Sequence, residues 1–566
     1  MDPSRRDRAV TILDLLEARL DARPDEPLIE RLSDGSWQPT TVRQFHDDVI
    51  AVAKGLIANE IESGDRVALM CRTRYEWTLL DYAIGAAGAT SVPIYESSSP
   101  DQIRWICSDA GVKQTIVESR DNQLRAAQAI GHDADIWVIE SGLVDTLRDA
   151  GAGVCDEEIA RRREEVIAAD IPATIVYTSG ATGRPKGVVL THGNFVEFAH
   201  NIMADQSRTS LNDVFNVPGR RLLLFLPLAH VLARFGQVFS LSGRTALGHC
   251  PDLKEMPSLL TTFKPTFVLT VPRMLEKVYD AAEASAGTGF KLRVFRAAAA
   301  AAVSFSEAGQ TGRPSLPARL RHRVYDRLVY RSLRAAMGGA MRYLAVGGAP
   351  LNARLGHFFR GAGFTVLEGY GLTETTGSIF GNSTSRQIIG SVGLALAGVE
   401  VKYADDDEIL VRGASVFHHY HNNPVATAAA FTADGWFRTG DIGRPDPDGY
   451  LHITGRKKDI IVTAGGKNVA PAPLEDEVRS YSLIDQVVVV GDGRKYIGAM
   501  VTVARDAIPA WARRHGLPAD LTAEVVIRSQ AARDAIRDAI RRVNAKVSRA
   551  EAIKRIAILA TEFTEA

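Results

Sequence analysis

Cysteine is scarce in this chain of 566 residues, which contains four. Cys71, Cys107, Cys155 and Cys250 lack the short spacings of a metal site or a redox motif, so we expect buried, reduced thiols. No apolar run approaches the roughly 18 residues of a membrane span, and the first residues lack the apolar core of a signal peptide. These absences predict a soluble, cytoplasmic protein.

An excess of charge of either sign is also missing. Lys and Arg together number 67, as do Asp and Glu, so no overall field favours nucleic acid as a partner. Hydrophobic residues make up 46% and charged residues 24%, which is typical of a globular protein. The length exceeds what one hydrophobic core supports and predicts at least two domains.

The pattern of apolar residues predicts an α/β fold. After a helix over residues 8–22, short apolar strands at 66–70, 89–95, 114–117 and 135–139 alternate with helical stretches. Such alternation predicts parallel sheets covered by helices on both faces. Residues 280–340 read as helices interrupted near 309–317, and short strands after about residue 390 predict a small β-rich, barrel-like subdomain.

A polar, charged break at residues 454–459 predicts a domain boundary. Beyond it we expect a helix at 473–480, strands at 486–490 and 497–503, and one long helix at 522–545. The predicted domains are therefore 1–455, with two parallel-sheet subdomains and the β-rich one, and a small α+β domain at 456–566.

The segment from Tyr177 to His192 has the composition of a phosphate-binding loop. Glycines let backbone N–H groups approach an anion closely, hydroxyls add donors, and a lysine supplies positive charge. The alternative is an ordinary glycine-rich turn between two strands. The spacing is not that of a P-loop, because Pro185 precedes the lysine and Gly187 follows it. The candidate binding residues are Thr178, Ser179, Gly180, Thr182, Gly183 and Lys186.

Two further loops follow predicted strands, at residues 342–350 and 364–374. Open parallel sheets bind ligands at the carboxyl ends of their strands, where such loops meet. A carboxylate such as Glu374 suits a hard cation bound to phosphate oxygens. Read alone, Glu374 is a solvated glutamate; within Tyr-Gly-Leu-Thr-Glu-Thr-Thr-Gly the functional interpretation is favoured.

These motifs, in this order, closely resemble the adenylate-forming superfamily of acyl-CoA synthetases, luciferases and peptide-synthetase adenylation domains. The resemblance implies ATP as substrate, with Thr178 and Glu374 at Mg²⁺ and Thr373 near the α-phosphate. It also implies that Asp441 accepts hydrogen bonds from the ribose and that Arg456 contacts ribose or phosphate. The residues implied around adenine and the acyl pocket are Gly348, Ala349, Glu368, Gly369 and Tyr370.

Residues 455–471 resemble the hinge and the thioester-forming loop of that family. The resemblance implies a mobile small domain with its hinge at 456–459 and its pivot at Lys458, because hinges concentrate backbone change at a few positions. Gly465, Gly466 and Lys467 would line the path of coenzyme A. The alternative is a plain interdomain linker with a β-turn.

The resemblance is to the long-chain fatty acid branch. Residues 226–234 resemble its acyl-side helix, with His230 beside the substrate carboxylate; a satisfied core histidine is an equal alternative. Residues 92–102, 271–277 and the helical insert at 280–340 also fit that branch. We therefore expect a long-chain fatty acid–CoA ligase, with peripheral membrane contact left open. Two alternatives remain: transfer of the acyl group to a carrier protein or amine, and a non-catalytic acyl- or nucleotide-binding protein.

Two departures from the family bear on activity. Ala181 stands where the family has Ser or Thr. The sequence stops before the family's C-terminal lysine segment, and Lys546 and Lys554 do not match it. Losing one charge at the transition state costs about 3–4 kcal/mol, or roughly 10²–10³ in rate, so we expect poor adenylation by the chain as given.

Overall fold

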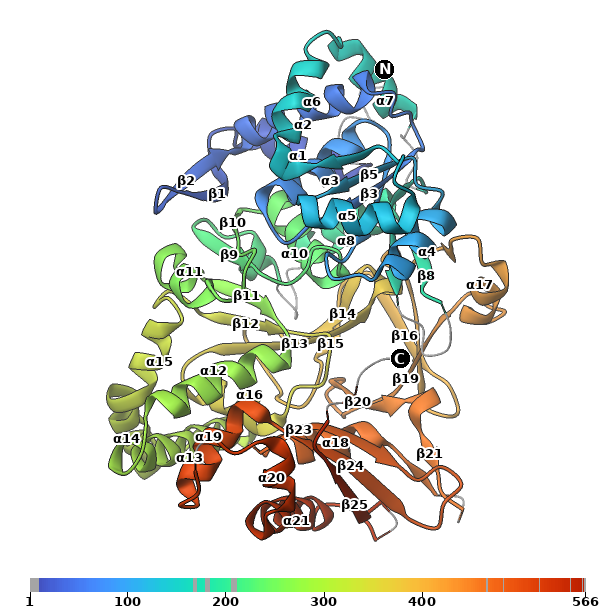
Figure 1. Cartoon of the computed structure of the whole chain (residues 1–566). Coiled ribbons are helices and arrows are strands. Elements are labelled where there is room, and N and C mark those ends of the chain that lie inside the picture. The colour runs from blue at the N-terminus through green and yellow to red at the C-terminus, as the bar shows by residue number, and fades with distance from the viewer. Residues whose placement is uncertain are drawn as a thin grey trace.

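The structure, a computed structural model, describes residues 10–165, 170–178, 184–204, 211–464, 467–481, 483–518, 520–549, 551–561 and 563. In Figure 1 the chain descends from helices and a sheet at the top, through a second sheet, to a small C-terminal unit at the bottom. Two large, mostly parallel sheets form its upper and middle parts, as the alternation of strands and helices predicts.

The first sheet has seven strands in the order β18-β8-β7-β4-β3-β5-β6. Strands β3, β4, β5, β6 and β7 run parallel, whereas β8 returns antiparallel to β7 and β18 adds antiparallel to β8. Its strands are β3 (Arg66–Met70), β4 (Thr90–Ile94), β5 (Gln114–Val117), β6 (Ile136–Val138), β7 (Pro172–Thr178), β8 (Lys186–Thr191) and β18 (His419–Tyr420). The accompanying helices are α3 (Tyr75–Ala86), α4 (Pro100–Ala110) and α5 (Arg120–Ile130).

The second sheet has nine strands in the order β15-β14-β13-β12-β11-β9-β10-β1-β2. Its central strands are parallel, and its two ends are antiparallel hairpins, β1–β2 and β13–β14–β15. The strands are β1 (Pro27–Ser33), β2 (Ser36–Thr41), β9 (Arg220–Leu224), β10 (Thr245–His249), β11 (Phe267–Thr270), β12 (Tyr343–Val346), β13 (Thr365–Leu372), β14 (Gly377–Gly381) and β15 (Leu394–Ala395).

Helices pack around both sheets. Helices α1 (Ile12–Ala22), α2 (Val42–Ala58), α6 (Leu143–Gly151), α7 (Asp156–Glu165), α8 (His192–Ala204) and α9 (Asn212–Phe215) belong to the upper half. Helices α10 (Val231–Ser242), α11 (Met256–Phe263), α12 (Pro272–Ser285), α13 (Phe290–Thr311), α14 (Leu316–Tyr325), α15 (Arg331–Ala336) and α16 (Ala353–Gly361) follow, with a π-helical turn at Asp326–Tyr330. The helical insert expected at 280–340, with its break near 309–317, is confirmed.

Helix α10 joins the two halves. Residues 231–241 are buried along its whole circumference, which is the pattern of a helix enclosed on all sides. Phe235 and Phe239 stack at 4.2 Å between ring centroids, and Arg234 forms a buried ion pair with Asp81 of α3 at 2.7 Å. Removing one partner of a buried ion pair typically costs about 3–5 kcal/mol, so this contact holds α10 against α3.

A four-stranded antiparallel sheet forms the expected β-rich subdomain. Its order is β16 (Val399–Tyr403), β17 (Glu408–Gly413), β19 (Phe437–Pro445) and β20 (Leu451–Arg456), with α17 (Pro424–Ala430) between β18 and β19. The polar, charged segment at 454–459 is regular in its first half and irregular in its second. Residues 454–456 continue β20 because Arg456 pairs with Asp441 across the sheet, and the irregular part is a short 3₁₀ turn at Lys457–Asp459.

The C-terminal unit has its own apolar core, with Val478, Val501, Trp511 and Ile536 buried. Its elements are β21 (Ile461–Val462), β22 (Asn468–Val469), α18 (Pro471–Arg479), β23 (Ile484–Val490), β24 (Ile497–Val503), α19 (Ile508–Arg514), α20 (Ala523–Arg528), α21 (Gln530–Asn544) and β25 (Ile553–Leu559). The expected single helix at 522–545 is wrong. Ser529 is extended, and its hydroxyl accepts a hydrogen bond from the Ala532 N–H, which caps a new helix.

Two expectations from composition can be compared with the structure. Cys71, Cys107 and Cys250 are buried and free, but Cys155 is exposed because it precedes α7 at the surface. Among the described residues, no helix is both long enough and apolar enough to cross a bilayer.

Candidate active site

The candidate residues of the middle sheet gather at one edge. Strands β9, β11, β12 and β13 are parallel neighbours, so the segments after them meet at the carboxyl edge. His230 follows β9, Gly348 and Ala349 follow β12, and Tyr370 and Glu374 lie at the end of β13 or just beyond it. Such an edge is where open α/β sheets bind ligands.

The predicted phosphate loop connects β7 to β8 as an antiparallel hairpin. Thr178 and Lys186 pair directly at its base, while Ser179, Gly180, Thr182 and Gly183 lie outside the described residues. The exposed Lys186 Nζ lies 5.2 Å from the centroid of the Tyr420 ring. Tyr420 in turn donates a hydrogen bond to Glu374 Oε1 at 2.8 Å. One tyrosine therefore connects the candidate phosphate lysine with the candidate metal carboxylate.

Glu374 lies in a 3₁₀ turn, Thr373–Thr375, that the chain around residue 417 holds in place. The Phe417 N–H donates to the Glu374 carbonyl oxygen at 2.8 Å, and the Thr376 hydroxyl donates to the Ser415 carbonyl oxygen at 2.6 Å. Thr376 has φ +59°, an unusual conformation for a β-branched residue. Strain of this kind persists where the surroundings impose it, and here it accompanies a fixed orientation of Glu374.

A second cluster joins β13, β19 and β20. The Tyr370 hydroxyl donates to Asp441 Oδ2 at 2.6 Å, and Arg456 Nε lies 3.1 Å from Asp441 Oδ1. Burial raises the pKa of Tyr370 and that of Asp441, while the positive charge of Arg456 acts to lower the pKa of Asp441. A carboxylate has about four acceptor positions, so two remain for donors such as sugar hydroxyls.

Glu368 is buried beneath this cluster rather than facing outward. Its Oε1 accepts a hydrogen bond from the Gly390 N–H at 3.0 Å, and burial raises the pKa of Glu368 to about 8. Burial therefore favours the protonated, neutral form of this side chain. Its carbonyl oxygen accepts from the Asn382 N–H, which ties β13 to the loop after β14.

Glycine is required at Gly371, where β13 crosses β14 closely. A Cβ there would lie 1.8 Å from the Gly377 carbonyl oxygen. The loop after β12 turns through Gly348 at φ +78° and leaves Gly348 and Ala349 exposed at the carboxyl edge. Close backbone approach explains the glycines that flank Tyr370 in the sequence.

His230 caps the amino end of α10. Its Nδ1 accepts a hydrogen bond from the Leu232 N–H at 3.1 Å, so in the neutral ring the proton is on Nε2. His230 has an exposed surface at the edge of the sheet. Neighbouring protein atoms still displace part of its hydration, and this desolvation lowers the pKa of His230. A neutral imidazole with a free Nε2–H can donate to a carboxylate oxygen.

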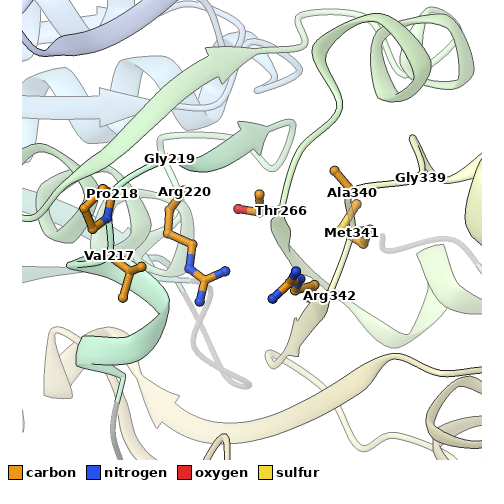
Figure 2. Close-up of a pocket in the computed structure, with 9 residues that line it drawn as sticks. All are labelled: Val217, Pro218, Gly219, Arg220, Thr266, Gly339, Ala340, Met341 and Arg342. Carbon is orange, nitrogen blue, oxygen red and sulfur yellow. The ribbon is translucent and has the colours of Figure 1, made fainter.

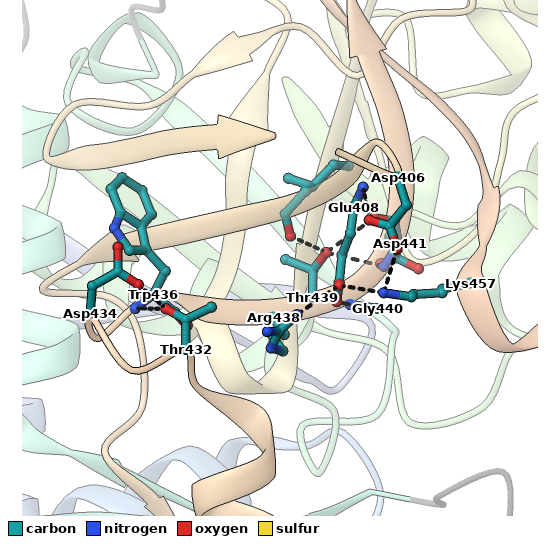
Figure 3. A network of polar contacts seen from close by, with 11 residues as sticks. Asp406, Glu408, Thr432, Asp434, Trp436, Arg438, Thr439, Gly440, Asp441 and Lys457 are labelled. Carbon is teal, nitrogen blue, oxygen red and sulfur yellow. Dashed lines mark hydrogen bonds and ion pairs between the residues drawn. The ribbon is translucent and has the colours of Figure 1, made fainter. Parts of the chain in front are cut away.

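The turn at 457–459 is held by acidic residues of β17 and the loop before it (Figure 3). Lys457 Nζ lies 2.9 Å from the buried Glu408 and 2.6 Å from Asp406, and Arg438 lies 3.2 Å from Glu408. The next residue, Lys458, is exposed, and its charge reaches Asp441. The fixed lysine thus directly precedes the residue at which we expect a pivot.

The candidate thioester loop is the hairpin between β21 and β22. Gly465 and Gly466 lie outside the described residues, and Lys467 is exposed at the base, where its N–H donates to the Thr463 hydroxyl at 3.2 Å. A contact from the large domain reaches the C-terminal unit elsewhere: Arg273 of α12 lies 2.8 Å from Asp485 of β23.

The single carboxylate of Glu374 is a suitable ligand for an Mg²⁺ ion that is bound together with a nucleotide. The described residues contain no group of three or more His, Cys, Asp or Glu that could hold a metal. Mg²⁺ usually takes only one or two protein carboxylates, with substrate phosphates and water completing its shell. Tyr420 donates to Oε1 of Glu374, and within the part of the chain that the structure describes Oε2 has no hydrogen bond, so it is available to a cation.

A separate cavity lies away from these residues. It measures about 450 Å³ and is lined by residues 217–220, Thr266 and residues 339–342, which precede β9, β11 and β12 (Figure 2). It therefore opens at the amino edge of the sheet, opposite the carboxyl edge. We assign the candidate site from the chemistry of the carboxyl edge and not from this cavity.

Sequence reasoning missed Tyr420 and Glu408. Tyr420 stands outside the quoted motifs, and only the pairing of β18 with β8 brings it beside Lys186. Glu408 reads as an ordinary residue of an apolar strand, yet it is buried and paired. The signal in the sequence is an acidic residue directly before the apolar run Ile409–Val411, and this signal is weak.

Comparison with known proteins agrees with this geometry. Residues 16–421 match a family model described as AMP-binding enzyme, and residues 458–566 match one described as AMP-binding enzyme C-terminal domain. A long-chain-fatty-acid–CoA ligase, FadD15 of Mycobacterium bovis, is 45% identical over 548 residues, which cover 96% of this chain and 90% of that protein.

Solved structures share the fold. O-succinylbenzoate coenzyme A synthetase from Bacillus subtilis, in complex with ATP and magnesium, has a TM-score of 0.69 and 21% identity, covering 96% of this chain and 95% of its own. A Mycobacterium tuberculosis fatty acyl CoA synthetase has a TM-score of 0.61 and 24% identity, covering 99% and 95%. The expected fold class, a large α/β domain with a small C-terminal one, is confirmed.

Proposed function

Because this chain belongs to the AMP-binding enzyme family, we propose that it is an ATP-dependent ligase that activates long-chain fatty acids, first to acyl-AMP and then to acyl-CoA. The observation that carries the proposal is its similarity, over nearly all of both chains, to a long-chain-fatty-acid–CoA ligase. The clusters of charged and polar residues described above support the proposal, because they contain the residue types that this reaction needs.

In the first step a carboxylate oxygen of the fatty acid attacks the α-phosphorus of ATP, and pyrophosphate leaves. We propose that Lys186 and the loop residues Thr178, Ser179, Gly180, Thr182 and Gly183 bind the phosphates, with Thr373 near the α-phosphate. Glu374 and the Thr178 hydroxyl would hold Mg²⁺, which neutralises charge on the departing pyrophosphate. Reactions of this kind depend on positioning and charge stabilisation more than on covalent chemistry.

The adenosine half of ATP would lie against the second cluster. Tyr370 offers a ring face to adenine, and Asp441, oriented by Tyr370 and Arg456, accepts from the ribose hydroxyls. Gly348, Ala349, Glu368 and Gly369 would form the surrounding wall. On the acyl side, His230 would donate through Nε2 to the substrate carboxylate.

In the second step the thiol of coenzyme A attacks the acyl carbon, and AMP leaves. We propose that residues 1–455 and 456–566 act as separate domains, and that the smaller turns about Lys458 within the hinge 456–459. Gly465, Gly466 and Lys467 would then line the path of the pantetheine arm. The irregular turn at 457–459, between strands of two sheets, supports a hinge at this position.

Two finer points concern the partners of the ligase. The alternative acceptor to coenzyme A is a carrier protein, and a substrate that partitions into lipid favours peripheral contact with a membrane. The test is pyrophosphate release with ATP, Mg²⁺ and fatty acids of graded length, followed by addition of coenzyme A or a pantetheinylated carrier protein. Thioester formed with coenzyme A and not with the carrier protein supports the ligase. Thioester formed only with the carrier protein contradicts the ligase and favours the alternative acceptor. ATP binding without pyrophosphate release from any fatty acid contradicts enzymatic activation altogether.

A further inference from the structure

The continuous helical segment from α14 to α15, residues 316–336, has an outer face that combines aliphatic and positively charged side chains. Four aliphatic residues recur at intervals of four: Leu316, Leu320, Val324 and Leu328. Their side chains are 78, 65, 50 and 60% exposed, and helix α14 has no buried residue. A surface helix of a globular protein normally turns such a stripe towards the core.

The helix geometry keeps this stripe on one side. An α-helix has 3.6 residues per turn, so a spacing of four drifts slowly around its axis. The π-helical turn at Asp326–Tyr330 is wider and counters that drift at Leu328. The result is a single aliphatic stripe along the outer face of the segment, which we call the outer stripe.

Arginines flank the outer stripe with the same period. Residues 313–334 contain seven arginines and one acidic residue, Asp326, which pairs with Arg334. Within the described ranges, the five arginines beside the stripe have neither an ion pair nor a side-chain hydrogen bond. These five are Arg319, Arg321, Arg323, Arg327 and Arg331.

The opposite face of the segment is already engaged with the protein. His322 stacks on Phe305 with ring centroids 4.0 Å apart, and the Tyr330 hydroxyl donates to the Ala298 carbonyl oxygen at 2.7 Å. The segment therefore already packs on the protein through its opposite face, and the outer stripe faces away from the core. Figure 1 places α14 at the lower left margin of the molecule, where a flat surface could reach it.

We propose that the outer stripe and its arginines form a docking surface for an anionic lipid membrane. Amphipathic helices of this composition lie in the plane of a membrane, with aliphatic side chains among the acyl chains and guanidinium groups at the phosphates. Charge complementarity favours this occupant over a second copy of the chain. A symmetric dimer through this face would oppose five arginines to five arginines.

The proposal assigns the peripheral membrane contact proposed above to one surface of the chain. It does not depend on the ligase activity, because the helix lies apart from the candidate residues of the carboxyl edge. Each arginine near an anionic surface strengthens binding by about fivefold, so losing three weakens it on the order of a hundredfold. Placing a carboxylate in the aliphatic stripe opposes insertion and adds repulsion from the anionic headgroups.

The experiment is co-sedimentation of the full chain with vesicles, without ATP, fatty acid or coenzyme A. Vesicles of phosphatidylcholine with phosphatidylglycerol are compared with vesicles of phosphatidylcholine alone. We expect binding to the anionic vesicles, weakened on the order of a hundredfold in R319Q/R323Q/R327Q and abolished in L320D/L328D. Because no substrate is present, the result is independent of whether the ligase activity is found.

The matched control is R537Q/R541Q/R542Q, which removes the same three charges from the exposed face of α21 and should bind as the unchanged chain does. Thermal unfolding midpoints confirm that all variants fold. Equal binding by the two triple variants would overturn the proposal, as would equal binding to both kinds of vesicle. A concentration-dependent dimer that L320D/L328D abolishes, without vesicle binding, would assign the surface to a second copy instead. Binding to duplex DNA but not to vesicles would refute the proposal as well.

Discussion

Removing the Tyr420 hydroxyl tests whether this residue orients the metal carboxylate. In Tyr420→Phe the ring that faces Lys186 at 5.2 Å remains, and only the hydrogen bond to Glu374 at 2.8 Å is lost. Burial and the adjacent Glu374 raise the pKa of Tyr420, so the hydroxyl donates at every pH at which the enzyme is assayed. The variant therefore isolates one interaction.

The expected size follows from the environment of Glu374. A hydrogen bond to a charged group contributes about 1.5–3 kcal/mol, and the lower end applies because Glu374 is partly exposed. A loss of about 1.4 kcal/mol corresponds to about tenfold in rate. We expect kcat/KM for Mg·ATP in pyrophosphate release to fall by about tenfold, with a higher Mg²⁺ requirement.

The control is Tyr330→Phe, which removes a buried hydroxyl from the core beneath α14 and should leave the Mg²⁺ dependence unchanged. Tyr420→Leu also removes the ring next to Lys186 and should cost more than Tyr420→Phe. If Tyr420→Phe keeps the rate and the Mg²⁺ dependence of the unchanged enzyme within about twofold, the orienting role is refuted.

Three further predictions follow from the site. Glu368 keeps its proton up to about pH 8 in the folded protein but loses it near pH 4.5 in the unfolded chain. Its raised pKa therefore stabilises the fold at low pH. This contribution, on the order of a few kcal/mol, is lost as the pH rises from 4.5 towards 8. Glu368→Gln should flatten the fall of the thermal midpoint between pH 5 and 8; an unchanged slope contradicts the assignment. Asp441→Ala removes the acceptor for two sugar hydroxyls, and each lost hydrogen bond costs about 1 kcal/mol. Calorimetry should therefore show ATP binding weakened by about tenfold or more. Unaltered affinity would exclude a ribose contact. Arg273→Glu breaks the ion pair with Asp485 and should change the ratio of the two half-reaction rates by up to about fivefold. Adding Asp485→Arg should restore the original ratio. A ratio that neither change affects would show that this contact has no role in domain orientation.

Regular elements with strong local signals could be predicted from sequence. The strands at 66–70, 114–117 and 497–503 have the expected bounds, because each is a short apolar run bounded by polar or glycine-rich turns. The break at Ser529 could not be predicted, since helical periodicity continues on both sides of it. An extended serine that caps the next helix becomes evident only from its backbone angles.

The motif residues could also be found from sequence, whereas their supports could not. Tyr370, Glu374 and Asp441 stand in recognisable motifs, and the structure brings Tyr370 and Asp441 into contact. Tyr420 and Glu408 act through pairings between distant strands, and no local pattern encodes such pairings. Sequence thus reveals which groups carry the chemistry, and the tertiary fold determines what holds them.

The pairing of β18 with β8 has a consequence for the synthesis of the chain. Val188 of β8 is synthesised about 230 residues before its partner Tyr420 of β18, so the edge of the first sheet is completed only after Tyr420 is made. At the usual ribosomal rate of about 5–20 residues per second, that edge stays open for roughly 10–50 s. An unpaired edge strand is a template for aggregation, so the nascent chain is most vulnerable during this interval. The candidate phosphate and metal site assembles only when the same two-residue strand arrives, so completion of the sheet and of the site is a single late event.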